Sequence, residues 1–414
     1  MDPVRNPFSP GAGTAPPELA GRDEILASAE VALRRTMEGR AAKSQLLLGL
    51  RGVGKTVLLN AIARMAQDLG YAVVLLEAPE DLRLAELLVP PLRRELFRLD
   101  KAAGAAEAVR KAMGVLRAFA SVFKVSAGDI EFGVEAAPGT ADSGDLNFDL
   151  PELFGAVAEA AKAAKKPFAL FLDEIQYLSE QDLRALIVAL HAAAQQRLPI
   201  ILFGAGLPQL AALAGDAKSY AERLFDYPAV GPLAPEAARA AIERPIHDEG
   251  ADITSDAVDA LVDVTEGYPY FLQAWGSAAW NTAAASPINA EDAARATVLA
   301  RAELDNGFFR VRWDRLTDAE RQYLRRMASL GAGPYRSGDI AKAMGKQVSQ
   351  VSTLRDGLIH KGMIYSPQHG ETAFTVPLFD DYLRRTAPVP PTAPRAASSG
   401  ASPRALPKPR KRSD

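Results

Sequence analysis

The sequence predicts an α/β protein with a parallel sheet in its first half, a helical segment after it and a small module near the C-terminus. Three observations carry this prediction. Up to about residue 233, short apolar runs alternate with helical patterns, as expected for strands that are buried on both faces and joined by helices. Residues 234–306 have a wholly helical pattern. Residues 307–386 show three helical stretches and then two short strands around a turn.

The composition narrows the class of protein. The 414 residues are enough for two or three domains. The net charge of −3 provides no overall basic field, so any nucleic-acid contact must come from a local patch. The absence of cysteine excludes disulfides, cysteine-ligated zinc and thiol catalysis, and the four histidines have no ligand-like spacing. No window of about 18 apolar residues is present, so we expect a cytoplasmic protein without membrane contact.

The two ends of the chain differ from the rest. Residues 1–18 are rich in proline and glycine and predict an extended arm, whereas residues 387–414 predict a disordered basic tail. Residues 124–139 are irregular, and the alternation in "IEFGVE" favours a hairpin insertion. The apolar runs that we expect to form the sheet are residues 44–50, 71–78, 168–174, 199–206 and 227–233.

Residues 49–56 read GLRGVGKT, a glycine and four residues before Gly-Lys-Thr. Glycines permit backbone conformations that turn successive amide N–H groups toward one anion, and a helix starting at Lys55 adds the positive end of its dipole. In such a phosphate-binding loop (P-loop), Lys55 would contact the β- and γ-phosphates of ATP and Thr56 would bind Mg²⁺. The residues predicted to bind the nucleotide here are Gly49, Gly52, Gly54, Lys55, Thr56 and Val57. The alternative is a flexible glycine turn, but the preceding strand and following helix favour the P-loop.

A second motif lies at the end of the apolar run "FALFLDE". An Asp-Glu pair at the end of a buried strand, in a chain with a P-loop, fits the Walker B role. Asp173 would hold Mg²⁺ through water, and Glu174 would polarise the attacking water. The alternatives are a solvated carboxylate pair, or a site that binds nucleotide and hydrolyses it slowly.

With these motifs the chain resembles the AAA+ and STAND P-loop ATPases. More narrowly, it is similar to the origin-recognition-complex-like and archaeal-type ATPases with a C-terminal winged helix. The resemblance implies an AAA+-like P-loop NTPase core (residues 19–233), a helical lid (234–306) and a winged helix-turn-helix (307–386).

Three weaker elements add to the resemblance. "LAGRDEIL" is similar to the element that lies against adenine and implies a nucleotide contact for Arg22. "KSYAERLFDYPAVGPL" resembles the segment that carries an arginine finger, which implies that role for Arg223. "EGYPYFLQ" resembles the Gly-x-Pro element of a STAND lid, which implies a nucleotide contact for Pro269.

Each weaker element also has a simpler interpretation. Arg22 could merely precede a helix, Arg223 could pair with a neighbouring carboxylate or face solvent, and Pro269 could simply begin a helix. Arg51, inside the P-loop, is a competing candidate for a finger within one chain. A finger acting between chains would require a homo-oligomer formed through the ATPase core.

The chain departs from AAA+ enzymes in two places. The run "PIILFGAG" ends in Gly204, Ala205 and Gly206, where these enzymes usually place a polar sensor of the γ-phosphate. The lid has no sensor arginine beside "GYP". Both departures favour a nucleotide-controlled switch over a vigorous motor.

The C-terminal module has the order of a winged helix-turn-helix. Thr317 and Glu320 form a capping-box pattern ahead of the first helix, and residues 347–364 predict the third helix. Lys346 and Lys361 flank that helix. The exposed polar side chains predicted to contact duplex DNA are Gln347, Ser349, Gln350, Ser352, Thr353 and Arg355, with His369 on the wing. The alternative is a winged helix that docks proteins.

We therefore expect an ATP- and Mg²⁺-binding ATPase whose nucleotide state controls a DNA-binding winged helix. The expected catalytic residues are Lys55, Glu174 and Arg223. The alternative function is a STAND-like signalling switch with slow or no turnover, whose winged helix docks an unknown protein partner.

Overall fold

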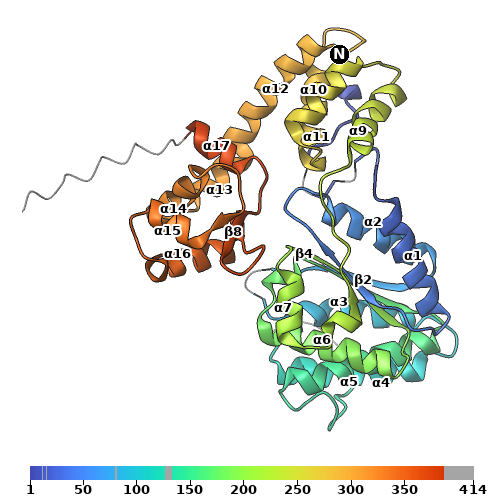
Figure 1. The fold of residues 1–414 in the computed structure, drawn as a ribbon. Coiled ribbons are helices and arrows are strands. Elements are labelled where there is room, and N and C mark those ends of the chain that lie inside the picture. Colours follow the sequence, from blue (N-terminus) through green and yellow to red (C-terminus); the bar gives the residue numbers. More distant parts are fainter. Residues whose placement is uncertain (12, 15, 80–81, 126–132, 387–414) are drawn as a thin grey trace, which may run out of the picture.

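The computed structural model describes the chain except residues 12, 15, 80–81, 126–132 and 387–414. The predicted basic tail and the centre of the predicted hairpin insertion therefore lie outside the described residues. The described chain consists of a sheet domain, a helical lid and a C-terminal module (Figure 1). None of its described helices has the length and apolar character needed to span a bilayer.

The first domain is built on one parallel sheet of five strands, in the order β2-β3-β4-β1-β5. Its strands are β1 (Ser44–Leu48), β2 (Ala72–Glu77), β3 (Phe168–Asp173), β4 (Ile200–Gly206) and β5 (Phe225–Asp226). Because β4 lies between β1 and β3, the end of β4 separates the predicted P-loop from the predicted Walker B pair. Because the strands are parallel, the predicted P-loop, the end of β4 and the predicted Walker B pair all lie at the same edge of the sheet.

The position of the fifth strand was predicted wrongly. We expected it at residues 227–233, but β5 is Phe225–Asp226, followed by a single bridge between Leu48 and Ala229. Pro228 lies between these two pairings and has no N–H to donate to the ladder, although its carbonyl accepts the Leu48 N–H at 2.9 Å. Of residues 227–233 only Val230 is buried, so the apolar run does not form a continuous strand of the sheet.

Alternate side chains of the strands pack into two separate cores. Leu170 and Leu172 face one core, whereas Ala169 and Phe171 face the other. Helices α1 (Asp23–Met37) and α2 (Lys55–Asp68) cover the second face, and the remaining helices of the domain cover the first. These helices are α3 (Leu84–Leu99), α4 (Ala106–Val122), α5 (Leu146–Ala163), α6 (Glu180–Gln195), α7 (Leu210–Ala217) and the short α8 (Ala221–Leu224).

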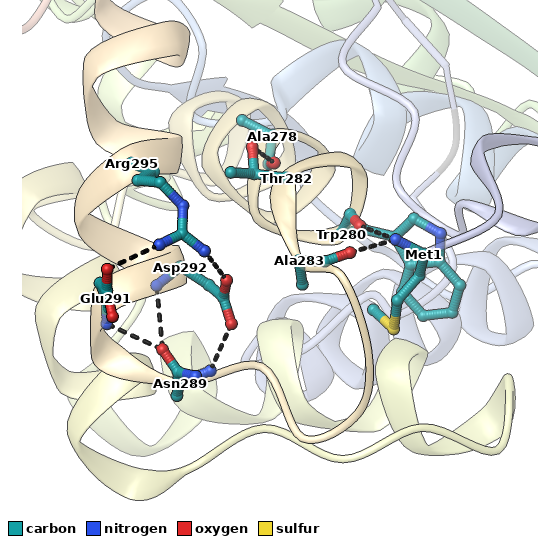
Figure 2. A network of polar contacts seen from close by, with 9 residues as sticks. All are labelled: Met1, Ala278, Trp280, Thr282, Ala283, Asn289, Glu291, Asp292 and Arg295. Atoms are coloured by element: carbon teal, nitrogen blue, oxygen red, sulfur yellow. Dashed lines mark hydrogen bonds and ion pairs between the residues drawn. The ribbon is translucent and has the colours of Figure 1, made fainter.

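The lid follows the sheet domain and is wholly helical, as predicted. It consists of α9 (Pro235–Asp248), α10 (Ser255–Thr265), α11 (Pro269–Thr282) and α12 (Ala290–Leu304). Asn289 and Asp292 form a capping box that begins α12, and Arg295 pairs with Asp292 one turn later (Figure 2). The N-terminal ammonium of Met1 donates to the Ala283 carbonyl at the end of α11 (Figure 2). The N-terminal arm is therefore attached to the lid.

The C-terminal module contains three helices followed by two short strands, the order expected from its sequence, and in addition a short strand and a C-terminal helix that were not predicted. A π-helical turn, η3 (Asp305–Phe309), and α13 (Arg310–Asp314) join it to the lid. The module then contains α14 (Asp318–Ala328), β6 (Tyr335–Arg336), α15 (Ser337–Ala343), α16 (Val348–His360), β7 (Ile364–Tyr365), β8 (Glu371–Phe374) and α17 (Phe379–Thr386). The strands form an antiparallel sheet in the order β6-β8-β7, and the predicted capping box of Thr317 and Glu320 is present.

Lid and C-terminal module share one hydrophobic core. Phe309 of η3 stacks on Tyr382 of α17, with ring centroids 5.2 Å apart, and contacts Phe379 at 5.6 Å. Arg385 of α17 forms an ion pair with Asp305 at 2.7 Å. These contacts join the two parts into one packed unit, which we call the lid–module unit (residues 235–386).

Candidate functional site

A cavity of about 260 Å³ lies where the sheet domain, the lid and the start of the C-terminal module meet. It is lined by the loop before α2, by the N-terminal arm, by the start of α11 and by the η3–α13 segment. From the sheet domain it includes Arg51, Gly52, Val53, Gly54, Lys55, Thr56, Val57 and Glu174; from the lid and beyond it includes Pro269, Tyr270, Gln273, Phe308 and Arg312. Most of the residues predicted to bind the nucleotide therefore meet at one cavity.

The backbone of the loop has the conformation that a phosphate site requires. Gly52 and Gly54 have φ values of 82° and 89°, a region that disfavours other residues, and Gly54 directly precedes α2. Gly49 is needed for a different reason, because a Cβ there would collide with the Val230 carbonyl. The N-terminus of α2 thus faces the cavity, where its free N–H groups favour an anion.

Lys55 is buried at the base of the cavity. Its Nζ donates to the carbonyls of Gly49 and Leu50, each at 2.9 Å. Burial lowers the pKa of the Lys55 ammonium, although Glu174 and Asp173 oppose this effect. An ammonium held by two carbonyls in a buried site is well placed to exchange them for phosphate oxygens.

Thr56 and Asp173 come together at the edge of the sheet, as the P-loop and Walker B interpretations require. The Thr56 hydroxyl donates to Asp173 Oδ2 at 2.6 Å, and the Glu174 N–H donates to Asp173 Oδ1 at 2.8 Å. Burial raises the pKa of the Asp173 carboxyl, an effect that these two hydrogen bonds oppose. A hydroxyl and a carboxylate are hard oxygen donors, so the pair fits Mg²⁺. The described residues contain no cluster of three or more His, Cys, Asp or Glu side chains able to hold a metal.

Glu174 faces the cavity and is held by a residue that sequence reasoning missed. Its φ of 52° is unusual for a non-glycine residue. Its carboxylate accepts a hydrogen bond from the Gln176 amide, whose oxygen in turn accepts the Leu207 N–H at 3.0 Å. Gln176 therefore links the Walker B turn to the end of β4.

The glycines at the end of β4 have a structural explanation. A Cβ on Gly206 would lie 2.7 Å from the Gln176 amide oxygen, and one on Gly204 would collide with Ile175. The strand ends in small residues because the turn after β3, η2 (Ile175–Tyr177), packs directly on it. A polar side chain does lie at the end of β4, but it is that of Gln176, which comes from the neighbouring turn and not from β4 itself.

Arg22 and Pro269 both line the cavity. The Arg22 guanidinium donates to the carbonyls of Val53, at 3.1 Å, and Gly231, at 2.6 Å. Arg22 thus joins the P-loop to the segment that leads into the lid. Pro269 occupies the first turn of α11, where its missing N–H costs nothing.

Arg223 does not reach the cavity of its own chain, as an arginine finger within one chain would have to do. It lies exposed on α8 and is not among the residues that line the cavity. A finger function for Arg223 would need a second copy of the chain. Arg51, the other candidate, lies at the cavity itself, and its guanidinium contacts the Tyr177 hydroxyl.

The N-terminal arm covers the cavity, which its sequence did not indicate. Phe8 is buried against Gly276 of α11, and the Ser9 N–H donates to the Gln273 side chain at 3.1 Å. Farther along, a Cβ on Gly13 would lie 3.4 Å from Thr56 Cγ2. The arm residues that line the cavity are Ser9, Pro10, Gly11, Gly13, Thr14, Pro16 and Glu18, and Leu19 and Ala20 directly after the arm also line it. The described residues of this arm therefore cover the cavity, and Pro3–Arg5 form the short helix η1.

The C-terminal module contacts the P-loop directly. The Arg51 N–H donates to the Thr375 carbonyl at 3.0 Å, and a Cβ on Gly362 would lie 2.6 Å from the Arg51 guanidinium. On the lid side, the Tyr270 N–H donates to the Gly52 carbonyl at 3.1 Å. Adjacent residues of the P-loop are thus held by two different parts of the lid–module unit.

The predicted DNA-contacting residues lie on and around α16. Those with exposed side chains are Gln347, Ser349, Gln350, Ser352 and Thr353. Arg355 instead donates to Thr372, at 3.2 Å, and Ser366, at 2.9 Å, and so fixes the β7–β8 hairpin against α16. Lys361 is paired with the buried Glu320 at 2.8 Å. Two of the basic groups considered for DNA binding are therefore engaged inside the module.

Comparison with known proteins agrees with this architecture. Residues 18–203 match the family model described as AAA ATPase domain, and residues 306–383 match the one described as Domain of unknown function (DUF8462). A search of the curated proteins found no match.

Among solved structures, the chain is similar to the Walker-type ATPase Paby2304 of Pyrococcus abyssi, with 18% identity and a TM-score of 0.57, over 90% of this chain and 97% of that chain. It also matches the RuvB Holliday junction branch migration motor of Thermotoga maritima (15% identity, TM-score 0.45, 90% of this chain and 99% of that chain). A third match is the Orc1 protein of Aeropyrum pernix in complex with DNA (15% identity, TM-score 0.44, 90% and 94%). The first of these and the sheet order confirm the predicted fold of the sheet domain.

Proposed function

We propose that this chain, whose residues 18–203 form an AAA ATPase domain, uses its nucleotide state to set the position of the lid–module unit on the P-loop. The resemblance to the AAA+ ATPases drawn from the sequence is confirmed by this domain match and by the fold.

The observation that carries the proposal is the contact between the P-loop and the lid–module unit. Arg51 donates its N–H to Thr375 of the module, and Gly52 accepts the N–H of Tyr270 of the lid. A phosphate bound by the P-loop lies next to both contacts. A change at the phosphates therefore acts on the docking of the whole unit.

The shared core supports one choice of moving part. The hypothesis from sequence placed the nucleotide-dependent angle between lid and winged helix. The packing of Phe309 on Tyr382 and the Arg385–Asp305 ion pair instead favour motion of lid and module together, against the sheet domain.

The chemistry of turnover is assigned to the residues at the edge of the sheet. Lys55 binds the phosphates, Thr56 and Asp173 hold Mg²⁺, and Glu174 orients and deprotonates the attacking water. The metal, when bound, neutralises charge on the phosphate oxygens. Gln176 holds the Glu174 carboxylate in place through its amide. Arg223, exposed on α8, serves as a finger in a homo-oligomer.

Duplex DNA is the partner that we propose for the module. The exposed face of α16 offers the hydroxyl and amide groups of Ser349, Gln350 and Thr353. Arg336 of β6 and Lys346, just before α16, are exposed in the same module and form no ion pair among the described residues, so they can contact phosphates.

A second candidate function is supported by a specific observation. Arg355 and Lys361 are engaged inside the module, which leaves α16 with a mostly neutral face. Such a face suits a protein partner, as in a signalling switch with slow turnover.

One experiment separates the two candidates. The full chain is titrated onto labelled duplex DNA with ADP or with a non-hydrolysable ATP analogue, at two salt concentrations. The proposal predicts salt-dependent binding that differs between the nucleotides and loses this difference in Lys55→Ala. The control Lys218→Ala changes a partly exposed lysine that does not line the cavity. DNA binding that ignores the nucleotide contradicts the coupling, and no DNA binding in any state favours the protein-docking switch.

A further inference from the structure

We propose that Arg312 of α13 and Arg51 of the P-loop form a two-arginine site for the terminal phosphate of ATP, so that a residue of the C-terminal family segment reads the nucleotide. Arg312 lies within residues 306–383, the segment matched by the family of unknown function. It lies beyond the lid, and its pattern in the sequence gives no phosphate-binding signal.

The Arg312 side chain is fixed and directed at the cavity. Its guanidinium lies over the Phe308 ring, 3.8 Å from the centroid, and its Nη1 donates to the Phe308 carbonyl at 2.8 Å. Phe308 in turn stacks on Tyr270, with ring centroids 4.9 Å apart. Because the Tyr270 N–H donates a hydrogen bond to the Gly52 carbonyl, the stack of Arg312, Phe308 and Tyr270 connects α13 to the P-loop. Arg312 and Arg51 both line the cavity, together with Lys55 and Glu174.

The electrostatics of the pair are those of an anion site. Burial is the main cause that lowers the pKa of the Arg312 guanidinium to about 10; Arg51 and Arg315 contribute to this shift, and Tyr270 opposes it. Neither Arg312 nor Arg51 forms an ion pair with a carboxylate among the described residues. Arg51 also has a buried Nε without a hydrogen-bond partner in the part of the chain that the structure describes. Two partly buried cations that lack an ion-pair partner within the described ranges are stabilised when an anion binds between them.

The proposed anion is the γ-phosphate rather than a free anion. The same cavity contains the P-loop amides and Lys55, which bind the inner phosphates, so the arginines are left for the outermost group. ADP lacks this group. The pair therefore distinguishes ATP from ADP.

The site also gives a route to the module. Arg312 is three residues after Phe309, whose ring packs on Tyr382 of α17. A phosphate that draws Arg312 toward Arg51 pulls on the η3–α13 segment, which is the link between lid and module. This inference rests on the proposed function for the binding of nucleotide at this cavity, but not on the identity of the partner.

The test compares the affinities of the full chain for fluorescent ADP and for a fluorescent non-hydrolysable ATP analogue. Arg312→Gln is expected to weaken binding of the triphosphate by about 10- to 100-fold and binding of the diphosphate by less than about threefold. Arg51→Gln should give the same selectivity. Arg310→Gln is the matched control, because it removes the same charge from an exposed position of the same helix.

The possible outcomes distinguish a phosphate-binding role of Arg312 and Arg51 from a packing role. Equal loss of both nucleotides in Arg312→Gln and Arg51→Gln, or no loss of either, overturns the proposal and leaves Arg312 a packing residue. If Arg312→Gln fails to fold, Arg51→Gln and the charge-conserving Arg312→Lys provide the same comparison. Selective loss combined with DNA binding that ignores the nucleotide keeps the two-arginine site and rejects the proposed coupling. Failure of the unaltered chain to bind either nucleotide rejects the proposed function and the site together.

Discussion

The cover formed by the N-terminal arm gives a prediction whose magnitude follows from the structure. Phe8 is 5% exposed and its ring packs directly on Gly276. The ring fits there only because Gly276 has no Cβ, which would lie 2.6 Å from Phe8 Cε1. Phe8→Ala removes this anchor and reduces the free energy that stabilises the docked arm by about 2 to 3 kcal/mol. The equilibrium between docked and released arm then shifts by about 30- to 150-fold.

The assay is the release of a fluorescent nucleotide after rapid mixing with an excess of unlabelled nucleotide. Because the arm covers the cavity beside Thr56, Phe8→Ala is expected to raise the dissociation rate by up to that factor. Val4→Ala is the control, since Val4 is in the same arm but 92% exposed. An unchanged dissociation rate in Phe8→Ala, with the arm newly sensitive to protease, would refute the idea that the arm retains the nucleotide.

Three further predictions concern the edge of the sheet. Gln176→Leu frees the Glu174 carboxylate and should slow hydrolysis by about tenfold with unchanged nucleotide affinity, measured by phosphate release and titration; equal loss of affinity contradicts a positioning role. Thr56→Val removes the hydroxyl bonded to Asp173 and should raise the Mg²⁺ concentration needed for turnover by at least about tenfold, read from a Mg²⁺ titration. Burial lowers the pKa of Lys55, and a bound phosphate raises it again. Nucleotide binding should therefore take up protons in the alkaline range and weaken as the pH rises, which calorimetry in buffers of different ionisation heat detects; proton release contradicts it.

Features that depend on a continuous stretch of chain could be predicted from the sequence. The P-loop is a local pattern whose glycines, lysine and threonine carry their own geometry, and Asp173 and Glu174 end a strand that is apolar throughout. The strand order then brings these two segments to one edge. The fold of the sheet domain, and the expectation that Thr56 and Asp173 lie close together, followed from such signals.

The missed features depend on contacts between distant residues. The sequence around Gln176 does not distinguish it from other polar residues, and only the structure shows that its amide connects Glu174 with Leu207. Arg312 is one of many arginines and gains its meaning from Phe308 and the P-loop. The arm reads as a flexible segment because its anchor, Phe8, binds a lid helix that lies over 260 residues away. No pattern within the arm indicates that partner.

The central claim is that the nucleotide state sets the position of the lid–module unit on the sheet domain. Since the chain has no cysteine, labels can be placed through Asp68→Cys on α2 and Lys346→Cys beside α16, both exposed. The distance between the two labels is measured by energy transfer with ADP and with a non-hydrolysable ATP analogue. We expect two different distances with the two nucleotides, and one common distance in the Lys55→Ala background. The same distance with both nucleotides in the otherwise unaltered chain would contradict the central claim.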